Sequence, residues 1–172
     1  DAPGLCDVFT RANAQLGFCS LLVNSASAFE YDDIDNITAK TMDPLYAVNF
    51  RAPVLLSRYF RDQLPETEKG LVVNLLDQKV FNLNPDFFSY PLMKSGLEAA
   101  TRLLAMAMAP RVRVCGVAPG LTLRSGDQTE EGFQAAHAKV PLGKGSTPEE
   151  IAESVAFLSR MPSMTGTTLV VD

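Results

Sequence analysis

The chain has 172 residues, of which 47% are hydrophobic and 20% are charged, and its formal net charge is −5. This length and composition fit a single globular domain over residues 1–172. The acidic balance and the lack of a Lys/Arg cluster argue against nucleic acid as a partner, because contact with phosphates needs concentrated positive charge. No apolar run is long enough to span a bilayer and the first residues lack the basic start of a signal peptide, so we expect a soluble, cytoplasmic protein without a membrane partner.

Apolar runs of strand type alternate along the chain with longer segments of helical period. In chain order, we expect helix 4–16, strand 20–23, helix 39–64, strand 71–76, helix 89–109, strand 112–117, helix 147–160 and strand 167–171. Pro110 ends the third helix, because proline cannot continue it. Thr147, with Pro148 and Glu150 after it, is typical of a capped helix start. The alternation predicts an α/β fold in which a parallel sheet carries helices on both faces.

Residues 122–144 depart from this alternation. The segment is polar, contains glycine and has weak periodicity, and it comes after a predicted strand. Long connections of this kind often cover a substrate, so the pattern predicts a substrate-binding loop region. We interpret His137, within this segment, as a solvated helix residue, because nothing near it in the sequence pairs with its ring.

The cysteines Cys6, Cys19 and Cys115 are widely spaced, odd in number and accompanied by a single histidine. This usage predicts neither a disulfide framework nor a metal site. We expect ordinary reduced thiols in the core.

Ligands of an open parallel sheet bind beyond the carboxyl ends of its strands. Residues 24–29 come after the first predicted strand, Asp77 after the second and residues 119–122 after the third. These residues are small, polar or turn-forming, as a loop that lines a cofactor requires. The sequence therefore directs the search for chemistry to this edge of the sheet.

Tyr90 and Lys94 are four residues apart near the start of a predicted helix, so both side chains lie on one face. A nearby positive charge lowers the pKa of a tyrosine, which helps its hydroxyl to donate or accept a proton near neutral pH. Pro91 is tolerated in the first turn of a helix. The spacing alone also fits an ordinary amphipathic helix surface, so its meaning depends on the motifs around it.

Four motifs, of which this pair is one, occur in a fixed order along the chain: Leu22-Val23-Asn24-Ser25-Ala26-Ser27, then Asn49, the pair Tyr90 and Lys94 itself, and the turn Pro119-Gly120. Together they resemble the short-chain dehydrogenase/reductase family over nearly the whole chain, and the first of them is similar to the family's Asn-Asn-Ala-Gly/Ser turn. Ser25 stands where a second asparagine is usual. The resemblance implies a Rossmann-like, doubly wound parallel sheet in three αβα layers. It also implies a glycine-rich turn upstream of these motifs, and this sequence lacks one, so we expect the domain to be N-terminally incomplete.

The resemblance also implies roles for individual residues. Catalysis is assigned to Tyr90, Lys94, Asp77 and Asn49, with Asn49 holding a water that links Lys94 to solvent. The cofactor would be bound by Asn24, Ser25, Ala26, Tyr90, Lys94, Pro119, Gly120, Leu121 and Thr122. The substrate would be bound by Ser27, Phe29, Asp77 and Tyr90.

Asp77 departs from the family pattern, because a serine is usual thirteen residues before the tyrosine. An aspartate there resembles the branch of pteridine reductases and dihydrofolate/dihydromonapterin reductases, as do Ser27, Phe29 and the run Gly120-Leu121-Thr122. In that branch the phenylalanine lies over the pterin ring, an arrangement that aromatic stacking makes reasonable. The alternative interpretation is that Phe29 is a pocket wall and Asp77 a local substitution.

An ionised carboxylate accepts hydrogen bonds and cannot donate one to a carbonyl oxygen. Asp77 therefore suits a substrate with N–H groups, or supplies a proton to a C=N bond if burial raises its pKa. We hypothesise hydride transfer from NADPH, which the resemblance favours over NADH, to a pterin or dihydrofolate-like substrate. The alternatives are a general carbonyl reductase or alcohol dehydrogenase and, in another class, a non-catalytic binding protein of the same fold. A homotetramer that packs the helix carrying Tyr90 is expected by the same resemblance, with residues 99–108 as its apolar surface.

Overall fold

The sheet of this protein consists, within the residues that the computed structural model describes (2–126 and 128–172), of four parallel strands in the order β1-β2-β3-β4. Its elements are α1 (Ala2–Leu16), β1 (Leu21–Asn24), α2 (Ala39–Tyr46), a π-helical turn η1 (Ala47–Arg51), α3 (Ala52–Gln63), β2 (Gly70–Leu75), a 3₁₀ turn η2 (Gln78–Val80), α4 (Ser89–Met108), β3 (Val112–Pro119), α5 (Glu130–His137), α6 (Pro148–Arg160) and β4 (Thr168–Val171). The register pairs Leu21 with Leu71, Leu71 with Arg113 and Gly116 with Thr168. The expected α/β fold is confirmed.

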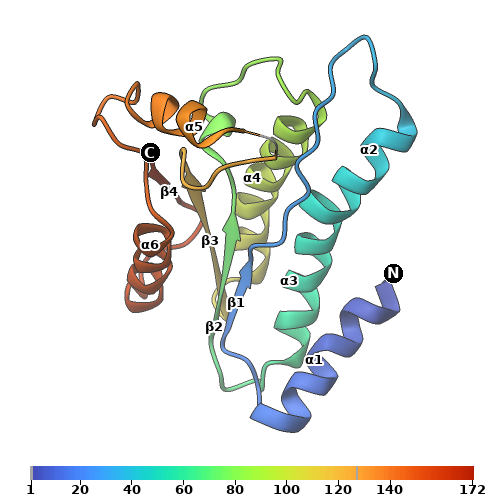
Figure 1. The fold of residues 1–172 in the computed structure, drawn as a ribbon. Helices are drawn as coiled ribbons and strands as arrows, with labels where there is room; N and C mark the ends of the chain where they lie inside the picture. Colours follow the sequence, from blue (N-terminus) through green and yellow to red (C-terminus); the bar gives the residue numbers. More distant parts are fainter. Residues whose placement is uncertain (1, 127) are drawn as a thin grey trace.

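Helices cover both faces of the sheet, as Figure 1 shows. On one face, α3 and α4 pack against the strands, and Phe60 and Met108 meet alternate strand residues such as Val72 and Val114. The other face of the same strands is covered by α6. The three αβα layers that the sequence predicts are therefore present.

The connection from β3 to β4 has the opposite hand to the two before it. The strand order runs in one direction through β1, β2, β3 and β4, and α3 and α4 make the first two crossovers on one face. The third crossover passes through α6 on the other face. Crossovers of parallel strands almost always share one hand, so this reversal is a distinctive feature of the topology.

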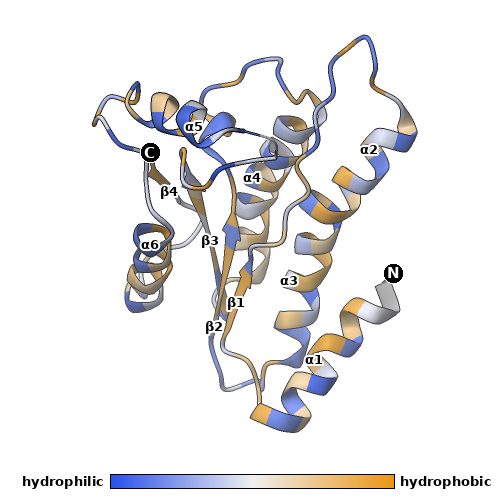
Figure 2. Ribbon diagram, in the orientation of Figure 1, coloured by the Kyte–Doolittle hydropathy of each residue, from blue (hydrophilic) through white to orange (hydrophobic). Residues whose placement is uncertain are grey.

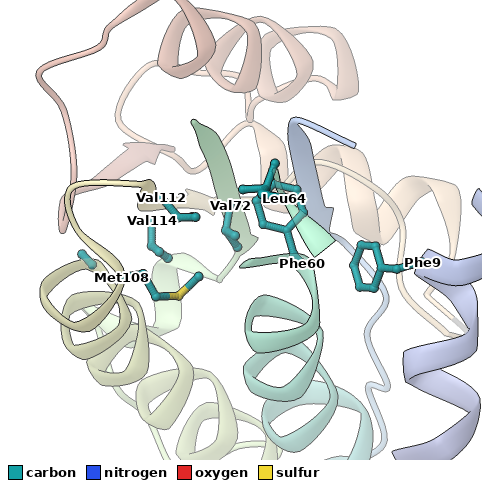
Figure 3. Close-up of a cluster of buried hydrophobic side chains, with 8 residues drawn as sticks. Phe9, Phe60, Leu64, Val72, Met108, Val112 and Val114 are labelled. Carbon is teal, nitrogen blue, oxygen red and sulfur yellow. The ribbon is translucent and has the colours of Figure 1, made fainter. Parts of the chain in front are cut away.

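The larger core cluster reaches from the sheet to the first helix. Figure 3 shows Phe9 of α1 facing Phe60 of α3, with Val72, Val112 and Val114 beyond it. Figure 2 shows that β1 and β3 are largely hydrophobic, whereas the helices alternate apolar and polar residues. Continuous apolar strands between two helical layers are typical of parallel sheets.

Three expectations from the sequence need correction. The segment 39–64 is interrupted by η1, so its middle turn is π-helical. Cys115 is buried, but Cys19 is half-buried and Cys6 is exposed, so not all three thiols lie in the core. His137 is half-buried rather than solvated, because its Nδ1 accepts a hydrogen bond from the Gly145 N–H at 3.0 Å and its ring packs on Phe133.

Two further observations concern the helices. The predicted cap at Thr147 is confirmed, since its side chain and that of Glu150 form a capping box at the start of α6. Among the described residues, no helix is both long and apolar enough to cross a membrane.

Candidate active site

The predicted reactive residues meet at the carboxyl ends of the strands. Asn24 ends β1, Asp77 lies two residues after β2 and Pro119 ends β3. Tyr90 and Lys94 lie in the first two turns of α4, which begins at the same edge of the sheet. The parallel topology thus brings together residues that are far apart in the sequence.

A direct hydrogen bond joins Tyr90 to Asp77. The Tyr90 hydroxyl donates to Asp77 Oδ2 at 2.9 Å, and Asp77 Oδ1 accepts the Lys79 N–H at 2.8 Å. The turn η2 therefore fixes the carboxylate, and the carboxylate fixes the phenol.

This contact reverses the expected shift of the Tyr90 pKa. Burial, the charge of Asp77 and their hydrogen bond raise the pKa of Tyr90 well above its usual value, while a hydrogen bond with Ser27 opposes them. Lys94 does not lower that pKa as predicted: its Nζ lies 5.7 Å from the centre of the Tyr90 ring and donates to the Leu75 carbonyl at 2.8 Å. In this arrangement Tyr90 is a protonated donor.

Lys94 is itself strongly affected by its surroundings. It is 3% exposed, and burial lowers its pKa to about 8, although the charge of Asp77 acts in the opposite direction. A buried ammonium so close to neutrality can hold or release a proton near the pH at which enzymes work.

Asn49 lies in the π-helical turn η1 and is fully buried. Its Oδ1 accepts hydrogen bonds from the Ala28 N–H at 2.9 Å and the Ser27 hydroxyl at 3.1 Å, and its Nδ2 donates to the Ala28 carbonyl at 2.7 Å. The amide therefore fastens the loop after β1 to the helix. π-Helical turns inside α-helices often occur at functional sites.

Ser27 and Phe29 reach Tyr90 from this loop. Ser27 bonds Asn49 and Tyr90, and the Phe29 ring meets that of Tyr90 edge to face at 4.7 Å. Phe29 is 39% exposed and stacks on Phe87 at 4.1 Å with an angle of 17°. Phe87 belongs to the site although no sequence pattern indicated it.

The predicted cofactor residues after β1 divide into two kinds. Asn24 is buried, and its Nδ2 donates to Asn74 Oδ1 at 2.8 Å, while Asn74 in turn donates to Thr101 Oγ1 at 2.9 Å. The Asn24 side chain therefore points into the protein and ties β1 to β2. Ser25 and Ala26 are exposed at the strand end.

The turn after β3 is fixed by neighbours that the sequence did not suggest. The Gly120 N–H donates to the Val171 carbonyl at 2.9 Å, and a Cβ on Gly120 would collide with the Asp172 side chain. Thr122 Oγ1 donates to the Gly120 carbonyl and lies 2.7 Å from Ser146 Oγ. The half-exposed Leu121 lies between them.

Comparisons with known proteins identify the family. A family model described as enoyl-(acyl carrier protein) reductase matches residues 3–172. The fold is similar to that of the FolM alternative dihydrofolate reductase 1 from Brucella canis, solved in complex with NADP. That structure is 40% identical, with a TM-score of 0.96 over 100% of this chain and 69% of the other. The chain belongs to the short-chain dehydrogenase/reductase family.

Curated relatives agree with this short-chain dehydrogenase/reductase assignment. The oxidoreductase YjdA of Bacillus subtilis is 30% identical over 92% of this chain and 64% of its own length. Pteridine reductase 1 of Leishmania tarentolae is 29% identical over 91% of this chain and 62% of its own length. The chain spans 64% to 66% of the length of the first curated relatives that it matches. Members of the family are NAD(P)-dependent oxidoreductases.

The residues just after β1 fit part of the NAD(P) cofactor of the short-chain dehydrogenases. Ser25 and Ala26 are small and exposed at the strand end, and Ala26 lines a hollow of about 630 Å³ together with Leu5, Val48 and Arg51. This volume lies in the range of small-molecule sites, and the Arg51 guanidinium suits an anionic ligand.

Proposed function

We propose that this chain belongs to an NADPH-dependent reductase that transfers hydride to the C=N bond of a pterin or dihydrofolate-like substrate. The observation that carries the proposal is the 2.9 Å hydrogen bond from Tyr90 to Asp77. The catalytic tyrosine of this site has a carboxylate as its partner, whereas a serine is usual at that position in the family.

The chemistry of the carboxylate supports a nitrogen heterocycle. Asp77 accepts hydrogen bonds when ionised, so it suits the N–H groups of an amino-pyrimidine edge and would repel a carbonyl oxygen. Reduction of C=N adds a hydride to carbon and a proton to nitrogen. Tyr90, whose pKa is raised, keeps its proton until a more basic atom approaches, so it can supply that proton directly or through Asp77.

The remaining residues would bind and orient. NADPH, when bound, supplies the hydride; Lys94 and Tyr90 would hold it at the strand ends, together with Asn24, Ser25, Ala26, Pro119, Gly120, Leu121 and Thr122. The two Brucella FolM structures, each 40% identical to this chain, are complexes with NADP, which supports NADPH over NADH. Ser27, Phe29 and Asp77 would contact the substrate, and residues 122–144, with α5 inside them, would cover it.

The test is a substrate comparison on the full-length protein. With NADPH as the reductant, we expect turnover of dihydrobiopterin or dihydrofolate and little turnover of simple ketones. Asp77→Ser should lower kcat/KM for dihydrobiopterin by about 10²-fold, a typical contribution of acid–base groups, while the Kd for NADPH changes less than threefold. Turnover of ketones without turnover of pterins would contradict the proposal.

A general carbonyl reductase is the second candidate. Two relatives favour it: L-xylulose reductase from Mesocricetus auratus is 27% identical, and 2-(S)-hydroxypropyl-CoM dehydrogenase 3 from Xanthobacter autotrophicus is 30% identical. In that case Asp77→Ser should raise ketone turnover, because a hydroxyl can donate to the carbonyl oxygen.

We also propose that the protein self-associates, as a homotetramer, through the outward face of α4. Leu103 and Met106 are large, apolar and exposed on that face. Exposed apolar surface of this kind marks an interaction site. Light scattering of the wild type and of Met106→Glu measures the oligomeric state.

A further inference from the structure

Helix α4 begins without a cap of its own. Phe88 occupies the cap position and makes no side-chain hydrogen bond there. The first N–H groups of a helix need acceptors, and one of them finds its acceptor 57 residues away: Asp32 Oδ1 accepts the Ser89 N–H at 2.9 Å. The Asp32 carbonyl also accepts the Phe88 N–H at 3.0 Å.

Asp32 is only 1% exposed, so its carboxyl group has been removed from water. Burial of a charge is costly unless it is compensated, and the positive end of the α4 dipole lies against this carboxylate. Asp32 Oδ2 and the Ser89 hydroxyl have no partner among the described residues. Burial of the Asp32 carboxylate therefore costs free energy. The residue that this carboxylate holds is Ser89, next to Tyr90.

The segment held by Asp32 includes a strained phenylalanine. Phe87 has a φ of 56°, in the left-handed region that bulky side chains rarely adopt. This backbone turns its ring onto the ring of Phe29, while the Lys79 ammonium lies 5.3 Å from the centre of the Phe87 ring. Strain of this kind persists where the surroundings enforce it, and it clusters at ligand sites.

Two segments are thus joined twice. Residues 29–32 carry Phe29 and Asp32, and residues 87–90 carry Phe87 and Tyr90. Asp32 joins them through its carboxylate, which accepts the Ser89 N–H, and through its carbonyl, which accepts the Phe88 N–H. The stacked rings of Phe29 and Phe87 join them a second time. We infer that Asp32 and Phe87 are positioning residues: Asp32 holds the turn before α4, and Phe87 fixes the plane of the Phe29 ring, which makes the site selective for flat heteroaromatic substrates.

This inference rests on the proposed function, because it assigns the origin of that substrate preference. The Phe87 ring stacks on Phe29 and meets Tyr31 edge to face, and the proposed proton and hydride transfers do not involve it. Its loss should therefore weaken binding of a flat ring and leave the chemical step alone.

The experiment uses Phe87→Asn, because asparagine tolerates the left-handed backbone but lacks the ring. We expect the KM for dihydrobiopterin to rise about tenfold, the value of one good aromatic stack, with kcat and the Kd for NADPH within twofold of wild type. Phe87→Tyr keeps the stack and should restore the wild-type KM. Phe81→Leu, an exposed phenylalanine of the same connection, is the matched control and should change none of these quantities.

Asp32→Ala should raise the same KM, whereas Asp32→Asn, which keeps an acceptor for the Ser89 N–H, should restore most of it. The double variant of Asp32→Ala and Phe87→Asn should be no worse than the worse single variant, because both act through Phe29.

The outcomes separate the two proposals. An unchanged KM in Phe87→Asn, or equal losses in KM, kcat and NADPH affinity, would overturn the positioning role and leave the reductase intact. A wild-type protein that reduces no pterin would overturn the proposed function and this inference together.

Discussion

The connections after β1 and after β3 both border the candidate site, but they are held in different ways. Residues 25–38 are fastened by two fully buried side chains, Asn49 and Asp32, which bond their backbone and that of α4. Residues 120–147 are tied to β4 at their start, where the Gly120 N–H donates to the Val171 carbonyl. The contacts of Thr122 with Ser146 and of His137 with Gly145 lie within the segment, and every residue of α5 is at least partly exposed. The first connection is therefore built to position groups, and we expect the second to open more easily.

The largest effect on activity should come from the Tyr90 hydroxyl, which lies beside the connection of residues 25–38. Tyr90→Phe removes the hydroxyl that bonds Asp77 and leaves the ring packed against Phe29. We expect kcat/KM for the reduced substrate to fall by about 10³-fold, within the range for a lost general acid. The Kd for NADPH should rise far less, because Lys94 and the strand-end residues would still hold the cofactor.

Tyr59→Phe is the matched control, since that tyrosine packs against the core on α3, and its activity should equal that of wild type. Full activity in Tyr90→Phe would mean that another group supplies the proton.

Much of this arrangement could be predicted from the sequence. The strand ends, Tyr90, Lys94 and Asp77 could be expected to meet, because parallel strands end at one edge and helix spacing sets two of the side chains. The direction of the Tyr90 pKa could not, because it depends on burial and on Asp77 being nearer than the Lys94 ammonium. Asp32, Asn74 and Phe87 left no local pattern, since their contacts cross 27 to 58 positions of the chain.

The next largest effect should come from loosening the connection of residues 25–38 itself. Asn49→Ala leaves the N–H and the carbonyl of the half-buried Ala28 without their partners. A fully buried unsatisfied group costs about 1–3 kcal/mol, so these two half-buried groups together should lower the free energy of unfolding by about 2 kcal/mol.

Denaturant unfolding measures this change, and kcat should fall as well, because Ser27 and Phe29 lose their support. Asn82→Ala, on the exposed surface, should stay within about 0.5 kcal/mol of wild type. Equal effects of the two substitutions would mean that Asn49 does not fasten residues 25–38.

A smaller effect concerns pH. The folded-state pKa of Lys94, about 8, lies below its unfolded value near 10.5. Between these values the unfolded chain binds the extra proton, so the free energy of unfolding from this group rises with pH, by at most about 1.4 kcal/mol per unit. Activity should move the other way, since the ammonium is lost above pH 8.

Lys94→Met, compared with wild type between pH 7 and 10, isolates both trends. The free energy of unfolding of Lys94→Met should not rise with pH in the way that the Lys94 pKa predicts for wild type. Changes caused by the titration of other groups should be the same in both proteins. A wild-type curve parallel to that of the variant would show that Lys94 keeps its proton throughout.

The smallest effect on global stability should come from a substitution in residues 120–147. His137→Ala removes the acceptor of the Gly145 N–H and the contact with Phe133, both at a half-buried position. One such hydrogen bond contributes about 0.5–1.5 kcal/mol, and a segment that opens locally contributes less to global stability. We therefore expect the midpoint of thermal unfolding to change little, while limited proteolysis cuts residues 120–147 several times faster. If instead His137→Ala destabilised the whole protein as much as Asn49→Ala, both connections would be equally fixed, and residues 120–147 could not open to admit a substrate without unfolding the site.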